Sequence, residues 1–402
     1  MSRPSFQTLV DSHRVGEPAY RKVRNVLAGA TVIGLAASAA GYALDHRQFA
    51  FSWLVSLAWA VTLSMGALFF IMIGHLTGAT WSVATRRIKE NLAAAIPVGA
   101  LLFLPVAFSL HELYEWTHAD VVAHDALLQG KAPWLNEPFF LIRAAVYFAV
   151  WSLLALKLRS LSVRQDEDGG SLELTKAAAR WSAPGTILAM ITVALASFDW
   201  LMSLEPHWYS TIFGVYVYSG GALAAMAALA LILIGLRQAG TLRSSVTMAH
   251  YHDIGKWIFA LTVFWAYIAF SQYLLIWYAN LPEETVWFQH RLTGSWRGVA
   301  AVLLFGNFVA PFLILISRAA KRRLGLLAAA AAWMLVMHYV DLYWIVMPVL
   351  HREGARPHWM DAAAFLAIGG AFGLAFWSRT RRDAVAPIGD LRFTDSLEHA
   401  NA

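Results

Sequence analysis

The sequence has no cysteine among its 402 residues, and only 14% of the residues are charged. A chain without cysteine can hold no disulfide, no iron–sulfur cluster bound by thiolates and no c-type haem attached through a C-x-x-C-H motif. Any redox centre that the function needs must therefore lie on a partner. Soluble domains carry nearly twice this share of charge, whereas 59% of the residues here are hydrophobic. The composition thus predicts an integral membrane protein.

The charged residues are clustered, and the stretches between clusters run for 17 to 29 residues with at most one charge each. A helix needs about 20 residues to cross roughly 30 Å of hydrocarbon, whereas barrel strands are about ten residues long and alternate. We therefore predict an all-α, polytopic transmembrane protein with ten helices. The predicted spans are 25–44, 48–73, 91–110, 138–156, 183–204, 208–236, 257–281, 298–317, 324–350 and 362–378.

The spans divide the chain into a polar N-terminal segment (1–24), spans one to four (25–158), a polar linker (159–182), spans five to ten (183–378) and a polar tail (379–402) that we expect to be mobile. Lysine and arginine number 24 on the side that carries both termini and 6 on the other, and Arg143 lies within a span. By the positive-inside rule this asymmetry predicts cytoplasmic termini. The net charge of +6 reflects this orientation and gives no support to nucleic-acid binding.

Ten polar residues at membrane depth or at the rim are candidates for a proton path. A charge inside the bilayer costs at least about 2.5 kcal/mol and usually faces the protein interior or an aqueous cavity. Four of the candidates lie in the outer half of their spans, two at the outer rim, one near the middle of its span and three near the inner end. In that order they are Arg143, Asp199, Gln272 and Asp341; Glu205 and His207; His338; and His75, His252 and Asp253.

His338 and Asp341 are three residues apart and so lie on one face of a helix, where the carboxylate could orient the imidazole or share a proton with it. They are a candidate relay. The alternatives are a structural pair, or an ion pair between Asp341 and Arg143 that holds two helices together. Asp199 is likewise either part of a proton exit or docking surface, or the partner of Arg143.

The inner group has two interpretations as well. Asp253 and Lys256 are either an i, i+3 ion pair at a helix start, with His252 at the interface, or part of a proton uptake site. Since His338 stands alone at the centre of its span, the paired histidines of a b-type haem are missing. No span carries an H-x-x-x-H or H-E-x-x-H motif, and the chain has no Walker loop. Metal chemistry and nucleotide-driven transport therefore have no support in the sequence.

Three long stretches resemble the signature segments of a known membrane-protein family. They are SFDWLMSLEPHW (197–208), FSQYLLIWYANLPEE (270–284) and MHYVDLYWIVMP (337–348), and HLTGATW (75–81) is a looser match. The sequence is similar in these stretches to the ActF family. Members of that family are the second large membrane subunit of alternative complex III, a bacterial quinol:cytochrome c oxidoreductase.

This resemblance implies a fold similar to the NrfD and PsrC-type membrane subunits. Spans two to five and six to nine form two four-helix bundles in that fold, and the first and last helices are peripheral. It also implies an inner-membrane subunit without a redox centre or covalent cofactor, which contributes to proton transfer and assembly. Quinone binding stays open. The implied partners are membrane lipid, an ActC-like membrane paralogue, and periplasmic subunits that carry iron–sulfur clusters and several c-type haems.

We expect Asp341, His338, Asp199 and Arg143 to form the outer half of a proton path, with Asp253, His252 and His75 as inner contributors. Two other functions remain as alternatives. A purely structural anchor subunit would tolerate neutral replacements of these residues as long as assembly survives. A stand-alone secondary transporter would have discontinuous helices around a substrate site at the midplane.

Overall fold

The computed structural model describes residues 13–400, and ten helices of this region are long and apolar enough to cross a membrane. Residues 13–400 form helices, turns and loops, with no β-strand. The chain is therefore an all-α, multi-pass membrane protein, as its sequence predicts. Residues 1–12 of the expected N-terminal segment and residues 401–402 of the expected tail lie outside the described residues.

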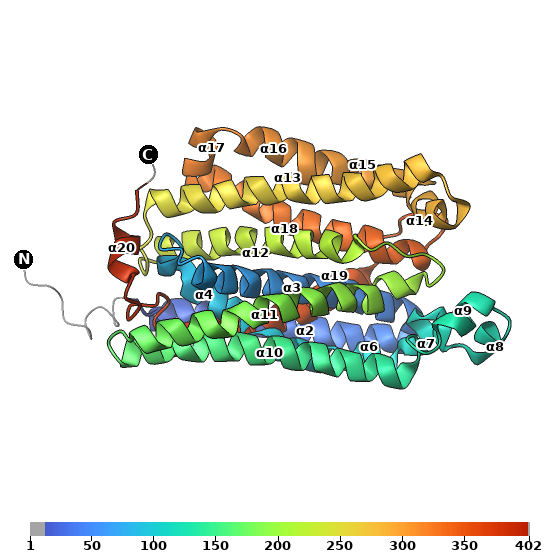
Figure 1. Cartoon of the computed structure of the whole chain (residues 1–402), viewed down its shortest axis with the longest axis horizontal. Coiled ribbons are helices and arrows are strands. Elements are labelled where there is room, and N and C mark those ends of the chain that lie inside the picture. The colour runs from blue at the N-terminus through green and yellow to red at the C-terminus, as the bar shows by residue number, and fades with distance from the viewer. Residues whose placement is uncertain (1–12, 401–402) are drawn as a thin grey trace, which may run out of the picture.

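The spans form a bundle of long helices whose axes are roughly parallel (Figure 1). Their elements are α2 (Glu17–Leu44), α3 (His46–Leu76), α4 (Val83–Ala93), α5 (Ile96–Leu102), α6 (Leu104–Phe108), α10 (Glu137–Glu167), α11 (Leu172–Trp200), α12 (Phe213–Gln238), α13 (Met248–Ala279), α15 (Trp296–Val302), a π-helical segment (Leu303–Val309), α16 (Ala310–Leu315), α18 (Leu324–Val346) and α19 (Trp359–Arg382). Several of these helices have a side-chain cap at their N-terminus. Asp45, Asn136 and Ser171 accept from backbone N–H groups at the starts of α3, α10 and α11.

Shorter helices lie at the two ends of the bundle. They are α7 (Leu110–Leu113), α8 (Ala119–Ala123), α9 (Ala126–Lys131), α14 (Pro282–Leu292), α17 (Arg318–Arg322) and α20 (Phe393–Leu397). The start of α2 and α20 lie at one end, which we call the inner end. The opposite end, with α8, α9 and α14, is called the outer end (Figure 1).

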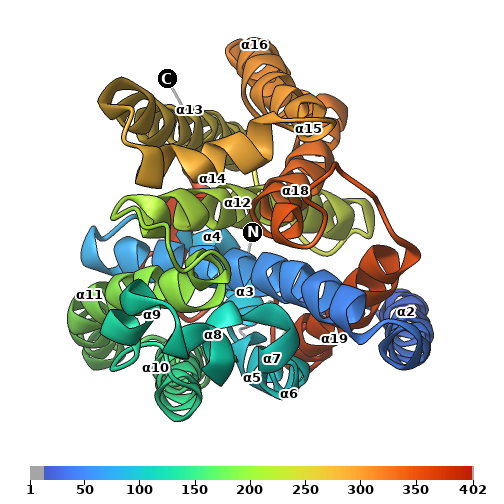
Figure 2. The same ribbon diagram turned by 90° about the vertical axis from the view of Figure 1, so that its right-hand side faces the viewer.

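The spans group into two bundles and a flanking pair. Viewed along the helices, α3, α5, α6, α10 and α11 lie on one side, and α12, α13, α15, α16 and α18 lie on the other (Figure 2). The bundles meet where α3 packs against α12, and α2 and α19 pair beside them. This is the arrangement that the resemblance implies, with spans two to five and six to nine as the bundles.

Two glycines allow α3 and α12 to touch. A Cβ on Gly221 would stand 2.5 Å from the carbonyl oxygen of Thr62, and one on Gly66 would stand 2.6 Å from the carbonyl oxygen of Gly221. Any side chain at either position would force the helices apart. Small residues serve the same purpose at many contacts between membrane helices, where close backbone packing replaces the hydrophobic effect.

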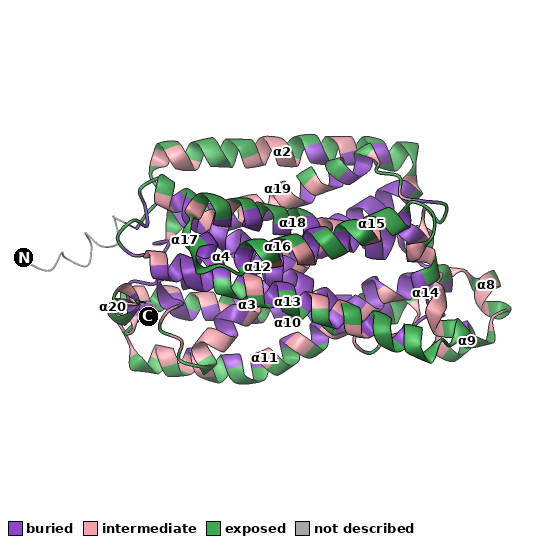
Figure 3. Cartoon of the chain, turned by 90° about the horizontal axis from the view of Figure 1, so that it is seen from above, coloured by how far each residue is buried: buried purple, intermediate pink, exposed green. Residues whose placement is uncertain are grey.

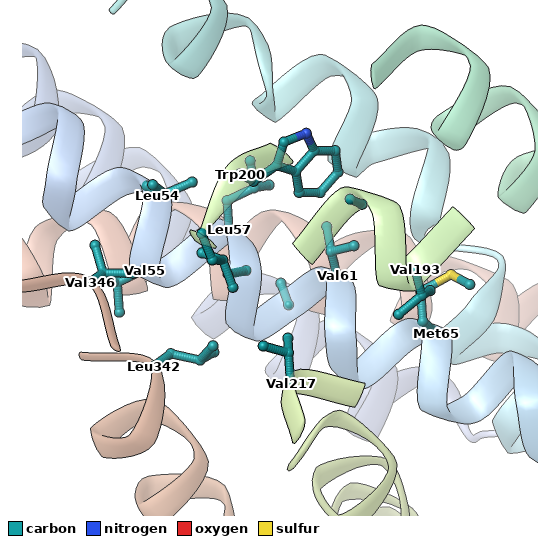
Figure 4. Close-up of a cluster of buried hydrophobic side chains, with 14 of the residues drawn as sticks. Leu54, Val55, Leu57, Val61, Met65, Val193, Trp200, Val217, Leu342 and Val346 are labelled. Carbon is teal, nitrogen blue, oxygen red and sulfur yellow. The ribbon is translucent and has the colours of Figure 1, made fainter. Parts of the chain in front are cut away.

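The core lies around α3, which is buried on nearly all sides. Side chains of α3 meet side chains from α11, α12 and α18 in one apolar cluster (Figure 4). The labelled members are Leu54, Val55, Leu57, Val61 and Met65 of α3, Val193 and Trp200 of α11, Val217 of α12, and Leu342 and Val346 of α18. By contrast, α2 is mostly exposed (Figure 3), as expected for a peripheral helix whose outer face meets lipid.

The third span differs from its predicted bounds. It begins at Val83 instead of residue 91, and it is broken into α4, α5 and α6, with Pro97 and Pro105 in the first turns of α5 and α6. The sequence placed Arg86, Arg87 and Lys89 in an inner loop, but all three are buried in α4. Burial is tolerated because acidic partners surround the two arginines.

The predicted linker and tail also differ in the structure. Helix α10 runs to Glu167 and α11 begins at Leu172, so the loop between them is much shorter than 159–182. The tail begins only after Arg382, and its residues are packed instead of loose. Val385 and Ala386 are fully buried, and α20 lies across the inner end beside α4. Polar residues of the tail find partners there, which composition alone did not indicate.

Candidate functional site

Arg143 and Asp199 form a buried ion pair between α10 and α11. The Arg143 guanidinium donates to both carboxylate oxygens, from Nε to Oδ2 over 2.8 Å and from Nη2 to Oδ1 over 2.9 Å. Its Nη1 donates to the carbonyl oxygen of Trp134 over 2.8 Å. The guanidinium also lies 4.2 Å from the Trp134 ring centroid and 4.4 Å from that of Phe139. Of the two partners left open by the sequence, Arg143 takes Asp199.

Asp199 has no free acceptor capacity for a mobile proton. Besides the two bonds from Arg143, it accepts from Trp134 Nε1 over 2.9 Å and from the Tyr147 hydroxyl over 2.8 Å. Each oxygen therefore has two donors, and the charge is matched by a guanidinium. This geometry is typical of a structural pair that joins two helices, which favours the structural alternative for Asp199.

Asp341 on α18 is buried in a different setting. Its Oδ1 accepts from the Tyr216 hydroxyl of α12, and its Oδ2 accepts from Trp265 Nε1 of α13 over 3.0 Å. The residue is 2% exposed. Among residues 13–400, no lysine, arginine or histidine forms an ion pair with it. Asp341 therefore differs from Asp199 because all of its hydrogen-bond donors are neutral. An unpaired charge in an apolar interior is very costly.

His338 lies one turn below Asp341, where α3, α12 and α18 meet. Its Nε2 is 2.9 Å from the Thr62 hydroxyl, while its Nδ1 is buried and has no hydrogen-bond partner in the described chain. A Cβ on Gly220 of α12 would stand 2.9 Å from this Nδ1 and 3.5 Å from Asp341 Oδ2. The two side chains thus face the same glycine, as their spacing predicts, but no direct hydrogen bond joins them among the described contacts.

Glu205 links the outer turn after α11 to α14. Its Oε1 is 2.6 Å from His290 Nδ1, and its Oε2 accepts from Arg291 Nη1 over 2.6 Å. Arg291 also donates to the carbonyl oxygen of Ile345 on α18 over 2.6 Å. Burial opposes the charged form of Glu205, but attraction to Arg291 and the bond to His290 outweigh it, so the pKa of Glu205 lies below its usual value. Charged Glu205 therefore holds the outer turn after α11 against α14, and Arg291 of α14 extends the contact to α18.

The other two outer candidates make single contacts. His207 Nε2 is 2.5 Å from Asp125 Oδ2 at the start of α9, and the histidine side chain is 48% exposed. Gln272 is buried on α13, and its Oε1 accepts from Ser210 Oγ over 3.1 Å. Within residues 13–400, neither residue forms a hydrogen bond with Asp341 or His338. The structure therefore does not join His207 or Gln272 to that pair.

The inner candidates lie together with the C-terminal tail. Asp253 is 2.5 Å from Lys256 Nζ and 2.6 Å from His399 Nε2, so the expected i, i+3 pair forms and gains a partner from the tail. His252 Nδ1 and His75 Nε2 are buried nitrogens without a hydrogen-bond partner among residues 13–400. They lie on different helices, α13 and α3, and neither one forms a hydrogen bond or ion pair with Asp253 in the described part of the chain.

A buried cluster at the inner end was missed by the sequence reading. Glu90 of α4 accepts from Arg86 Nε and Arg87 Nε, each over 2.9 Å. Arg86 also bonds Asp390 of the tail over 2.6 Å, and Arg87 bonds Asp166 over 2.8 Å. The i, i+4 spacing of Arg86 and Glu90 was the available signal.

Asp390 holds the tail against this cluster. Burial would raise its pKa, but the nearby Arg86 guanidinium and a backbone N–H outweigh that cost and lower the pKa to about 2. Asp390 is thus fully charged at neutral pH. The ion pair with Arg86 explains why the polar tail is ordered and buried.

A largely apolar interval separates the outer and inner groups, and Ser64 is the one polar side chain of α3 between Thr62 and His75. Helix α12 carries no polar side chain from Ala222 to Leu236. On α3, Thr62 and His75 are 13 residues apart, which corresponds to about 20 Å along a helix axis. The structure therefore brings Asp341 and His338 together with Tyr216, Trp265 and Thr62, but it does not join them to the inner candidates.

The three long stretches that carry the sequence resemblance meet at the outer end. Trp208 Nε1 donates to the carbonyl oxygen of Glu284 over 3.1 Å, which connects the first stretch to the second. The indoles of Trp208 and Trp287 stack at 4.7 Å, and Trp287 meets Trp344 of the third stretch edge to face at 5.4 Å. No three His, Asp or Glu side chains of residues 13–400 converge as metal ligands.

No protein-family model matches the chain, and no curated protein is significantly similar to it in sequence.

Proposed function

We propose that the chain is an integral membrane subunit of a bacterial respiratory quinol:cytochrome c oxidoreductase of the alternative complex III type. In this proposal it belongs to the NrfD/PsrC-like superfamily and lies in the inner membrane with both termini in the cytoplasm. It holds no redox centre, and it contributes to proton transfer and to assembly of the complex. Iron–sulfur clusters and c-type haems belong to periplasmic partner subunits, beside an ActC-like membrane paralogue.

The proposed role in proton transfer rests on the environment of Asp341. It is a buried carboxyl at membrane depth, held by Tyr216 and Trp265 and without an ion-pair partner in the described chain. Intramembrane ionisable residues of this kind commonly mark proton or substrate pathways. The meeting of the three motif stretches at the outer end supports the docking part, because that surface would face periplasmic partners.

The two donors to Asp341 are not equivalent. A tyrosine hydroxyl can either donate or accept, whereas an indole N–H can donate alone. When Asp341 is protonated, its proton therefore belongs on Oδ1, and the Tyr216 hydroxyl then accepts it. Trp265 keeps the same bond to Oδ2 in both states. Tyr216 is thus the residue through which the carboxyl exchanges its proton, while Trp265 positions it.

The first experiment tests the assignment to a complex. The tagged chain is purified from its native membrane in mild detergent, and its companions are identified by mass spectrometry and a reduced-minus-oxidised haem spectrum. Co-purification of c-type haem and an iron–sulfur subunit is the expected result. A solitary, haem-free protein would overturn the proposal.

The second experiment separates proton transfer from anchoring. In the assembled complex, Asp341→Asn should reduce quinol-driven proton release and turnover by about 100-fold, the order expected for loss of one acid–base group. Asp120 of α8, which is exposed at the outer end and lies outside the three motif stretches, serves as the control, and Asp120→Asn should leave both unchanged. If Asp341→Asn keeps wild-type turnover, proton release and subunit content, the chain is a structural anchor instead. The ion pair between Arg143 and Asp199, in which each carboxylate oxygen already has two donors, favours the structural-anchor alternative.

A further inference from the structure

Two cavities lie on the flank of the molecule, the inner one bordered by α2, α3, α12 and α19 and the outer one by α18 and α19. The inner cavity has a volume of about 480 Å³ and the outer one about 580 Å³. Trp59 of α3 and Leu335 of α18 border both of them. The Trp59 indole donates to the carbonyl oxygen of Leu335 over 3.1 Å, so this pair marks the place where the two cavities adjoin.

Together the cavities follow α19 through most of the membrane. The outer cavity reaches Asp361 near the start of α19, and the inner one reaches Trp377 near its end. These residues are 16 positions apart, about 24 Å along a helix, which is close to the roughly 30 Å of the hydrocarbon layer. The site is therefore long enough for one extended hydrocarbon chain.

Polar groups gather at the outer end of this site. Tyr339, Tyr343, His358 and Asp361 border the outer cavity, whereas Ser64 is the one polar side chain along the described wall of the inner cavity. The Tyr343 hydroxyl is buried, and although its oxygen interacts with a backbone N–H of Arg356, its own O–H has no acceptor within residues 13–400. A buried O–H without an acceptor is costly, and a ligand acceptor placed in the outer cavity would satisfy it.

The charges at the outer end restrict the head group. Asp361 contributes a carboxyl group, whose oxygens accept from Ser52 over 2.5 Å and from the His358 backbone N–H over 2.8 Å. No lysine or arginine of the described chain borders either cavity. A phosphate head would lack a cation and face a carboxyl group, so its burial there would be unfavourable.

We propose that this flank site binds an uncharged amphiphile with one long hydrocarbon chain. Its small head lies at the outer end and accepts a hydrogen bond from the Tyr343 hydroxyl, and its chain passes Trp59 toward Trp377. The site is distinct from the Asp341 group, and the proposal stands or falls independently of the respiratory assignment. An isoprenoid quinone and a monoacylglycerol share this chemistry.

The test measures binding to the purified, delipidated full chain by native mass spectrometry. Monoolein and oleoyl lysophosphatidylglycerol carry the same acyl chain and differ in the charged phosphoglycerol head. Monoolein should bind once per chain and at least about tenfold more tightly than the anionic lipid. Menaquinone-4 is tested beside monoolein, and the tighter binder shows whether the site prefers an isoprenoid quinone or a monoacylglycerol. Equal or tighter binding of the anionic lipid would overturn the proposal.

Two pairs of variants locate the site. No atom lies within 4 Å of a Cβ built on Gly369, which borders the inner cavity, so Gly369→Leu fills the cavity without a clash. This variant should weaken binding of the uncharged probe at least about tenfold, because the hydrocarbon chain of the probe loses buried contact. Gly298 is an exposed helical glycine with equal space and lies outside both cavities. Gly298→Leu should bind like the wild type.

The second pair concerns the head group. Tyr343→Phe removes a hydroxyl whose O–H has no acceptor in the described chain, so the fold loses at most a weak interaction with the Arg356 backbone N–H, while the probe should bind about fivefold more weakly. Tyr218 has a buried hydroxyl without a partner in the described chain but borders neither cavity, and Tyr218→Phe should have no effect on binding. Wild-type binding by both Gly369→Leu and Tyr343→Phe would refute the site.

Discussion

Replacing Asp199 by asparagine removes the negative charge that faces Arg143 but keeps the shape of the side chain. In the structure the guanidinium makes two charge-assisted hydrogen bonds to this carboxylate, of 2.8 and 2.9 Å. Each such bond contributes about 1.5–3 kcal/mol, and removal of one partner of a buried ion pair typically costs about 3–5 kcal/mol. The stability of Asp199→Asn should therefore fall markedly.

Part of this loss is offset by contacts that remain. The guanidinium still donates to the Trp134 carbonyl oxygen and lies between the Trp134 and Phe139 rings, and cation–π contacts of this kind contribute about 0.5–2 kcal/mol. We therefore expect a loss near the lower limit, about 3 kcal/mol, which is about a 150-fold change in the unfolding equilibrium. The measurement is the free energy of unfolding in mixed micelles titrated with dodecyl sulfate.

A double variant distinguishes the ion pair from general damage. Arg143→Met combined with Asp199→Leu removes both charges and should be more stable than Asp199→Asn, because no uncompensated charge stays buried. If the single variant is as stable as the wild type, the pair does not hold the helices. If it is stable yet abolishes proton release in the assembled complex, Asp199 carries protons and its assignment as a structural residue is refuted.

Two further predictions concern the tail and the contact between bundles. The lowered pKa of Asp390 stabilises the packed tail above pH 4 by about 2 kcal/mol, and this is lost as the pH falls through about 2; hydrogen exchange of residues 384–397 should rise over that interval, and Asp390→Asn should abolish the change. Gly221→Ala should destabilise the chain by about 1–3 kcal/mol through overpacking against Thr62, whereas Gly235→Ala on the same helix, with open space around its Cβ, should be neutral or stabilising by up to about 1 kcal/mol in the same unfolding titration.

The spans could be predicted because a membrane helix is specified locally. Each needs an apolar run of sufficient length, and the run can be counted in the sequence. The third span shows the limit of this rule. Its first eight residues, 83–90, include Arg86, Arg87 and Glu90, and they looked like a loop because the chain itself does not reveal that the charges neutralise one another. The packed tail was missed for the same reason, since Asp390 finds Arg86 across 304 positions.

The candidate site was predictable to the extent that its members share a helix. The spacing of His338 and Asp341 predicted that both lie on one face of their helix, which the structure confirms because both are close to Gly220 of α12. Their partners come from other helices. Tyr216 and Trp265 look like ordinary aromatic residues of apolar spans, and nothing in their local sequence marks them as donors to a carboxyl group. The partner of Arg143 was likewise open, because Asp199 and Asp341 were equally suitable in charge and depth.

The depth of the polar groups limits how this chain can move a proton. His338 and Thr62 are the innermost members of the outer group, and below them the wall formed by α12 offers no donor or acceptor side chain as far as Leu236. A proton that moved inward from Asp341 or His338 would have to cross the roughly 20 Å to His75 through water or after a change in helix packing. At Gly66 and Gly221 the two helices are too close for even a Cβ to fit between them. Under the proposed function, the outer group would accept or release protons at the outer end, whereas the inner charges hold α4, α10 and the tail together.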